Sequence, residues 1–452
     1  MTATTAFRLP VRVGVFIVLV LALLAVAQVR PAACLRGVGE AELYRRAGDS
    51  NVDLLCLTHR AGTPPEATNG FLQQALGFYE LSAARNPADA RPALSHALLL
   101  FYGGSRKEAR ESLVVALRAE RDESRRAAVR TAYLTLSVDR PNRAQVEALE
   151  QATSGSVAGA LATSEAYAVL GDAEAMQRTF DVGYARARRL LPLLSVTMGI
   201  AGALLLAAVI GLVSLLLSRG RKRREAVSVS PPPAAWSVPT ALEALAVFVL
   251  LQLVLATAAA ARWPERTYTP LLMLVPPALA GLGAILWVRL QSPGGAFGWR
   301  MDHPLRRALT GLAAGGGALA AAYLAAALVQ AVFKASPQEH PLVPVLAASS
   351  GLGEKLVLIV GACALLPVLE ETLFRGIFYG ALRRQWGVVG SVLASAVVFA
   401  AAHQDSAALL PYLLVGVVLA WLYERSGSLL TVTVAHAAFN LFGVMLALVM
   451  YG

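Results

Sequence analysis

Long apolar runs follow one long polar stretch along the chain. Runs of about 20 apolar residues, the length that crosses the core of a bilayer, cover 191–217, 238–261, 269–290, 308–333, 356–380, 388–403, 409–423 and 429–450. The pattern predicts an all-α, polytopic helical membrane protein, in which residues 238–345 form transmembrane helices. The runs at 388–403 and 409–423 are short, so we expect them to tilt, kink or cross only in part.

Another apolar run, at 11–29, lies within residues 1–34 and follows Arg8 and Arg12. Basic residues before a short apolar run are typical of a signal peptide or a signal anchor. We expect residues 1–34 to form an uncleaved anchor with its N-terminus in the cytoplasm. A cleaved signal peptide is the alternative.

Residues 35–188 are polar and rich in Ala, Arg and Glu, with apolar positions at helical spacing. Turn-forming positions at Gly104, Asp139 and Gly171 recur at about the 34-residue period of tetratricopeptide-type helical pairs. Most signature residues of that repeat are missing, so a plain helical bundle is the alternative. In both cases we expect a helical domain that docks a protein partner.

Composition and charge agree with a membrane protein. Hydrophobic residues make up 56% of the chain, charged residues make up 15%, and the mean hydropathy is +0.58. Soluble proteins average about 25% charged residues. The net charge of +11 does not indicate a nucleic-acid partner, because the basic residues lie beside apolar runs and are not interleaved with aromatic residues.

A basic cluster at 219–224 orients the chain in the membrane. It follows the apolar run at 191–217 and precedes three consecutive prolines at 231–233. We therefore interpret residues 189–237 as a transmembrane helix plus a basic, Pro-rich linker. Loops rich in Lys and Arg favour the cytoplasm. We therefore expect a multi-pass protein of a bacterial inner membrane, with residues 35–188 on the extracytoplasmic side.

Two of the three cysteines, Cys34 and Cys56, fall in or beside the predicted extracytoplasmic region, where a disulfide would persist. Two unlinked cysteines that pack as small apolar residues are the alternative. Cys363 lies inside an apolar run, and we expect it to pack in the core.

Ionisable residues interrupt the apolar run at 356–380. A charged residue at mid-bilayer costs about 2.5–3.5 kcal/mol on insertion scales, so such residues are usually paired and functional. Glu371 and Arg375 are four residues apart and can form an ion pair on one helix face. Glu370 is turned about 100° away from Glu371, which leaves its carboxylate available as a general base.

Two further runs carry polar side chains. His403 ends the run at 388–403, and His436 and Asn440 lie four residues apart in the run at 429–450. Together with the glutamates they supply what amide hydrolysis requires, which is a base that activates water and donors that stabilise an oxyanion.

These segments resemble the CPBP family, the CAAX prenyl-endopeptidase and bacteriocin-processing group of intramembrane proteases. The resemblance covers about residues 350–445, so residues 346–452 are similar to the catalytic transmembrane core of that family. The matching motifs are Glu370-Glu371-x-x-x-Arg375, Phe399-x-x-x-His403, His436-x-x-x-Asn440 and the turn at 425–428.

The resemblance implies an intramembrane endopeptidase. By this resemblance Glu370 and His403 would activate the attacking water, and His436 and Asn440 would hold the tetrahedral oxyanion. The remaining motif residues would support these four: Glu371, Arg375 and Phe399.

A zinc-dependent form is the alternative, because some members of the family have been described as metalloproteases. Glu370, His403 and His436 would then supply three protein ligands, the usual number in a catalytic zinc site. The chain has no His-Glu-x-x-His pair on one helix. We therefore favour catalysis without a metal or another cofactor.

The family resemblance allows prenylated C-termini, C-terminal sorting tails or leader peptides as substrates. Bacterial composition favours C-terminal or leader segments of exported or membrane-associated proteins, as in the myxosortases, which trim C-terminal anchors. Two other functions are alternatives. A non-catalytic scaffold or immunity protein would not need Glu370, and a transporter that carries protons on carboxylates would show paired broken spans in two halves.

Overall fold

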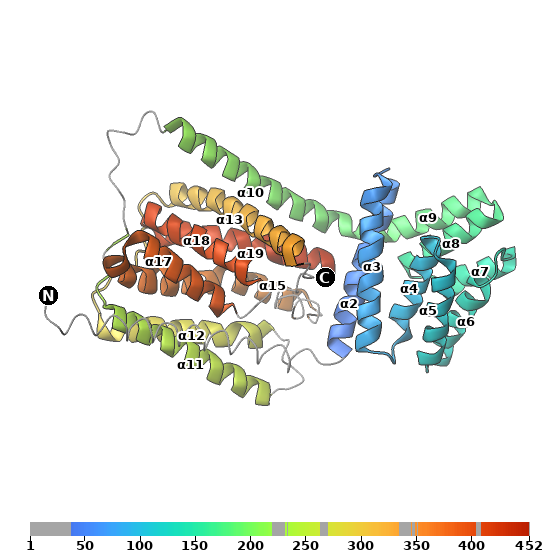
Figure 1. Ribbon diagram of the computed structural model, residues 1–452, viewed down its shortest axis with the longest axis horizontal. Helices are drawn as coiled ribbons and strands as arrows, with labels where there is room; N and C mark the ends of the chain where they lie inside the picture. Colours follow the sequence, from blue (N-terminus) through green and yellow to red (C-terminus); the bar gives the residue numbers. More distant parts are fainter. Residues whose placement is uncertain are drawn as a thin grey trace. The chain divides into compact units, whose positions relative to one another are not determined.

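The computed structural model describes residues 38–218, 231–232, 234–262, 270–333, 345, 349, 351–403 and 408–451. Within these ranges helices are the only regular secondary structure, which confirms the predicted all-α class (Figure 1). The chain divides into two compact units, one mainly of Leu35–Val196 and the other mainly of Thr197–Met445. The signal anchor predicted at 1–34 lies outside the described residues.

Eight α-helices build the polar unit, and consecutive helices contact one another in pairs. They are α2 (Val38–Arg60), α3 (Pro65–Arg85), α4 (Ala90–Tyr102), α5 (Arg106–Ala119), α6 (Glu123–Leu136), α7 (Arg143–Ala152), α8 (Val157–Leu170) and α9 (Ala173–Ala187). The helix pairs α4–α5, α6–α7 and α8–α9 begin at a regular interval along the chain. The N-cap residues of their first helices, Asp89, Asp122 and Ser156, are 33 and 34 residues apart. This spacing equals the tetratricopeptide period, and the docking role of the unit stays a prediction.

Cys56 is buried in α2 and its thiol is free. Burial raises the pKa of this thiol to about 12, so the side chain packs as a small neutral group. This favours the unlinked alternative for Cys56, and Cys34 lies outside the described residues. Cys363 is also free and is half-buried in the membrane unit.

A partly buried acidic pair on α2, Asp49 and Asp53, makes the stability of the polar unit depend on pH. Desolvation, with a smaller contribution from Asp49, raises the pKa of Asp53 to about 6, above about 3.9 in an unfolded chain. The folded state therefore binds the proton more tightly, and the resulting stability is present at acid pH and is lost as pH rises through 6. We expect α2 to lose on the order of 1 kcal/mol of stability between pH 5 and pH 7.5.

Hydrogen exchange of the α2 amides in the full-length protein, corrected for the intrinsic effect of pH, measures this loss. The Asp53→Asn variant should be insensitive to pH over the same range. An equal pH dependence in wild type and variant would assign the effect to other groups.

The second unit contains the apolar helices. They are α10 (Leu191–Ser218), α11 (Val238–Arg262), α12 (Pro270–Gln291), α13 (Pro304–Phe333), the helical run Leu352–Ala402, α18 (Leu409–Ser426) and α19 (Leu429–Tyr451). Within the described residues, seven helices are long and apolar enough to cross a membrane, which confirms a polytopic membrane protein.

The run Leu352–Ala402 contains two of the spans predicted from the sequence. Gly387 has φ 68° and ψ −170°, a backbone conformation that only glycine adopts easily, and it separates the two spans. In chain order the run comprises α15 (Leu352–Val360), η3 (Gly361–Leu365), α16 (Leu366–Glu371), η4 (Thr372–Tyr379) and α17 (Gly380–Ala402).

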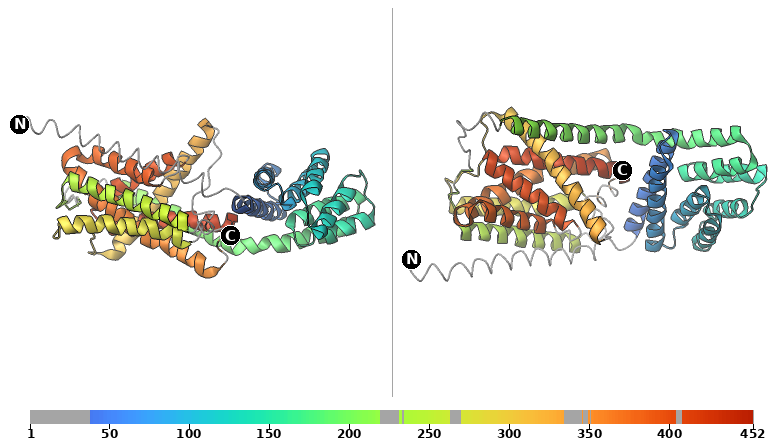
Figure 2. Two further views of the ribbon diagram at one scale, coloured as in Figure 1. Left: turned by 90° about the horizontal axis from the view of Figure 1, so that it is seen from below. Right: turned by 45° about the horizontal axis from the view of Figure 1, so that its top comes forward.

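Glycines on α13 allow α19 to approach closely (Figures 1 and 2). A Cβ atom at Gly315 would lie 2.9 Å from the Ala435 carbonyl oxygen, whereas a Cβ at Gly317 would meet no atom within 4 Å. We expect Gly315→Ala to destabilise the protein by about 1–3 kcal/mol, because the clashing atom is backbone. Gly317→Ala, the matched control, should be neutral or slightly stabilising.

Thermal unfolding of both variants in detergent tests this packing. Equal midpoints for Gly315→Ala and Gly317→Ala would show that α13 and α19 are not in close contact. Because Ala435 precedes His436, the Gly315→Ala variant should also displace a candidate site residue.

Candidate active site

The segment that carries the two glutamates departs from regular α-helix. Residues Gly361–Leu365 and Thr372–Tyr379, on both sides of α16, have π-helical hydrogen bonding. π-helical turns are rare, and they occur frequently at functional sites. The sequence predicted an ordinary helix here, so this distortion is a finding of the structure.

A fully buried carboxylate lies at the centre of the site. One oxygen of Glu371, Oε1, accepts a hydrogen bond from Arg375 Nη1 at 2.9 Å and another from His436 Nδ1 at 2.8 Å. Glu371 and Arg375 are 0% exposed and His436 is 1% exposed. The ion pair expected from the spacing of Glu371 and Arg375 is therefore present, and His436 joins it from α19.

Arg375 also connects neighbouring helices. Its Nη2 atom donates to the Gly416 carbonyl oxygen on α18 at 3.2 Å, and its guanidinium lies 4.4 Å from the centre of the Phe399 ring. A Cβ at Gly416 would lie 2.9 Å from Ala396 Cα, so glycine is needed for this approach of α18 to α17. The buried guanidinium thus has an anion, a carbonyl and an aromatic face as partners, and its Nε atom has no hydrogen-bond partner among the described residues.

Glu370 has a different environment from Glu371. Its side chain is 21% exposed, against 0% for Glu371, and its Oε2 atom lies 3.7 Å from His436 Nε2. The two adjacent carboxylates therefore differ in access. Glu371 is held inside the protein, and Glu370 remains reachable from outside.

His403 caps the C-terminus of α17 and is half-buried. Its Nδ1 atom donates to the Phe399 carbonyl oxygen at 2.8 Å, since a carbonyl oxygen can only accept. Its ring stacks on Tyr412, with 4.2 Å between the ring centres and 25° between the planes. Tyr412 was not predicted as a site residue, because an aromatic residue in an apolar run usually serves packing alone.

Glu370, His403 and His436 come together from three helices. One ligand atom from each of them, a carboxylate oxygen or an imidazole nitrogen, lies within 4.8 Å of the other two. The Nδ1 atoms of both histidines are engaged elsewhere, so each ring presents Nε2 to Glu370. Three ligand atoms at this separation can be bridged by a proton on Glu370 or on an Nε2 atom, by a water molecule or by a metal ion.

Asn440 contacts a different element from His436, although both lie on α19. Its Nδ2 atom donates to the Ala362 carbonyl oxygen in η3 at 2.8 Å. The amide group carries two N–H bonds, and this contact uses one of them. The structure thus brings His436 to the two carboxylates and Asn440 to the π-helical segment before them.

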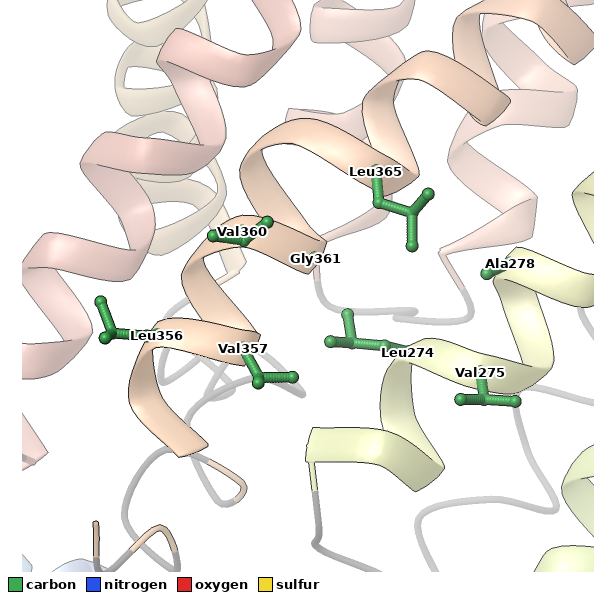
Figure 3. A pocket seen from close by; sticks show the side chains of 8 residues that line it. All are labelled: Leu274, Val275, Ala278, Leu356, Val357, Val360, Gly361 and Leu365. Carbon is green, nitrogen blue, oxygen red and sulfur yellow. The ribbon is translucent and has the colours of Figure 1, made fainter. Parts of the chain in front are cut away.

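An apolar groove lies between α12 and the α15–η3 segment (Figure 3). Its volume is about 410 Å³. The lining residues are Leu274, Val275, Ala278, Leu356, Val357, Val360, Gly361 and Leu365. Gly361 precedes Ala362, the residue that accepts the Asn440 hydrogen bond. The groove lining therefore includes the residue next to the Ala362 carbonyl oxygen that Asn440 contacts.

Fold and site together define a polytopic membrane protein with a carboxylate–histidine centre among its helices. Residues 352–442 match the family described as "Type II CAAX prenyl endopeptidase Rce1-like". This C-terminal part of the chain accordingly belongs to the CPBP family.

Two curated proteins are similar to the chain over short segments. "Putative membrane peptidase YdiL" of Bacillus subtilis (strain 168) is 37% identical over 82 residues, which are 18% of this chain and 34% of the relative. "UPF0177 protein YxdF" of Lactococcus lactis subsp. lactis (strain IL1403) is 32% identical over 80 residues, which are 18% of this chain and 44% of the relative. The matched segments thus span less than half of either relative. No solved structure matches the chain significantly.

Proposed function

We propose that the protein is an intramembrane endopeptidase whose hydrolytic centre consists of Glu370, His403 and His436. The convergence of these three side chains from three membrane helices, within 4.8 Å of one another, carries the proposal. The match of residues 352–442 to a family of membrane endopeptidases supports it. In this proposal the centre lies beside a second, fully buried carboxylate that serves structure and charge balance.

Glu370, assisted by His403, takes a proton from the attacking water and later transfers it to the leaving amine. The oxyanion of the tetrahedral intermediate is stabilised by N–H donors from His436 and Asn440. His436 donates from Nε2 only when both ring nitrogens are protonated, since Nδ1 already donates to Glu371. Glu371, which already pairs with Arg375, and Glu370 together supply the negative charge beside that cation.

The substrate is a protein segment at or in the membrane, either a C-terminal tail or a leader of an exported or membrane-associated protein. The apolar groove beside η3 supports a substrate with an apolar stretch next to the cleaved bond. In the same proposal the polar unit, residues 35–188, lies on the extracytoplasmic side and docks a protein partner.

A proteome comparison tests the proposed function in cells. Strains that produce the wild type, Glu370→Gln or Glu354→Gln are compared for protein size and release from the membrane. Glu354 lies on the same helical run, 16 residues before Glu370, and serves as the matched control. We expect at least one protein to change in the Glu370→Gln strain alone. Indistinguishable proteomes, with all variants expressed, would favour the scaffold alternative.

A zinc-containing form of the same centre is the second candidate, because the hydrogen bonds of the two histidines also fit a zinc site. Both Nδ1 atoms donate to oxygen, as zinc-binding histidines usually do, which leaves Nε2 as the ligand atom. Glu370, His403 and His436 would hold the ion, and zinc at this point would activate water and polarise the peptide carbonyl.

Chelation separates the two forms. We expect peptide hydrolysis by the purified protein to survive dialysis against a strong zinc chelator, because the metal-free route uses only protein side chains. Mass-spectrometric metal analysis should find far less than one zinc ion per chain. Activity that is lost on chelation and restored by zinc, together with one bound ion per chain, would assign the metal-dependent form.

A further inference from the structure

The backbone around His403 constrains the histidine ring weakly. His403 is the first residue after α17, with φ −74° and ψ −15°, and its backbone N–H donates to Ala400 in a three-residue turn. Helix ends fray more readily than helix interiors. A catalytic ring at such a position depends on side-chain neighbours for its orientation.

Two contacts of His403 come from its own helix. The hydrogen bond from Nδ1 to the Phe399 carbonyl oxygen, 2.8 Å long, fixes one edge of the ring. This hydrogen bond restrains the position of Nδ1, and the plane of the ring depends in addition on the groups that contact its faces. The Phe399 ring, 4.5 Å away and tilted by 56°, contacts the imidazole without lying parallel to it.

A stacking contact of the His403 ring comes from another helix. Tyr412, in the first turn of α18, is 6% exposed and lies nearly parallel to the imidazole, at 4.2 Å and 25°. Offset stacking of this kind is favourable and directional. Because Tyr412 is itself buried, its ring is a rigid surface for His403.

We propose that Tyr412 is a positioning residue, which sets the plane of the His403 ring and thereby aims Nε2 at Glu370. The inference rests on the proposed hydrolytic role of His403. It assigns the function of Tyr412 to its ring face, so an aromatic ring of similar size should replace it. A misplacement of about 1 Å in a catalytic group can reduce the rate by about 10²-fold.

Kinetics of three variants test this role. We expect Tyr412→Leu to lower kcat by about 10²-fold with little change in KM, and Tyr412→Phe to retain most of kcat. Tyr323→Leu is the matched control, because it removes a half-exposed tyrosine ring that contacts Phe442 on α19 instead. Wild-type kcat in Tyr412→Leu, or an equal loss in Tyr412→Phe, would overturn the proposal.

A spectroscopic measurement keeps the test independent of activity. In protein with isotope-labelled histidine, the His403 resonance, assigned with His403→Gln, should be shifted by the ring current of Tyr412. The part of the shift that Tyr412 contributes should be lost in Tyr412→Leu and persist in Tyr412→Phe, while the Phe399 ring keeps its own contribution in both. An unchanged resonance in Tyr412→Leu would refute the stacking. If Tyr412→Leu does not fold, Tyr412→Met takes its place in both measurements.

The two proposals fail in distinguishable ways. An inactive wild type whose His403 shift depends on the Tyr412 ring would overturn the peptidase and leave the positioning contact intact. An active wild type that requires Glu370 but not the Tyr412 ring would overturn the positioning role alone.

Discussion

Replacement of Glu370 by glutamine should reduce the rate of peptide hydrolysis by about 10³-fold or more, with no loss of folding. General acid–base groups contribute about 10²–10⁴-fold to a rate, and glutamine keeps the size of the side chain but cannot accept the proton of water. The side chain is 21% exposed and lies 3.7 Å from His436 Nε2, too far for a hydrogen bond, so we expect the fold not to depend on the charge of Glu370. Single-turnover kinetics and thermal unfolding of the same preparation measure both quantities.

Replacement of Glu371, the adjacent carboxylate, should have a different effect from replacement of Glu370. Glu371→Gln removes the charge that Arg375 and His436 share, within a site that is 0–1% exposed. We expect this variant to lose stability, whereas Glu370→Gln loses activity alone. If both variants unfolded at the same lower temperature, the separation of the two glutamates into a chemical and a structural role would be wrong.

Replacement of Arg375 by methionine should destabilise the protein by about 3–5 kcal/mol, because removing one partner of a buried ion pair leaves the other charge uncompensated. Arg375 is 0% exposed, and Glu371 would lose a hydrogen bond of 2.9 Å. Arg306→Met, on an exposed arginine of α13, is the matched control and should unfold like the wild type.

Lysine should not rescue position 375. The guanidinium donates in two directions, to Glu371 and to Gly416, and lies over the Phe399 ring. A lysine ammonium lacks the planar group that makes these contacts together. Thermal unfolding in detergent measures the midpoints. We expect the midpoints of the wild type and Arg306→Met to lie above those of Arg375→Lys and Arg375→Met. A wild-type midpoint for Arg375→Lys would show that the charge alone matters.

Much of the membrane unit follows from its apolar pattern. Runs of about 20 apolar residues require helices in a bilayer, because each backbone polar group must be satisfied within its own segment. The same physics singles out Glu370, Arg375 and His436, since polar groups inside such runs are costly and persist only when they are paired or functional.

The pairing of these residues could not be read from the sequence. The four-residue spacing of Glu371 and Arg375 predicts their contact within one helix. The contact from His436 to Glu371 joins residues 65 positions apart, and helical spacing carries no information about neighbours on another helix. The π-helical turns beside α16 also leave no periodic signal, because each changes the register by a single residue.

The proposed role of Tyr412 could not be predicted from the sequence for a related reason. An aromatic residue in an apolar helix has the same pattern whether it contacts lipid, packs in the core or stacks on a functional histidine. Only the 4.2 Å distance between its ring and that of His403 distinguishes these cases.

The most direct test of the central claim is the incorporation of oxygen from water into newly formed C-termini. Membranes from cells that lack the protein are incubated in H₂¹⁸O with purified wild type, Glu370→Gln or Glu354→Gln, and peptide C-termini are analysed by mass spectrometry. A hydrolytic centre at Glu370 predicts ¹⁸O-labelled C-termini with the wild type and Glu354→Gln, and none above background with Glu370→Gln. Equal labelling with Glu370→Gln and wild type, or no labelling with either, would contradict a peptidase centred on Glu370.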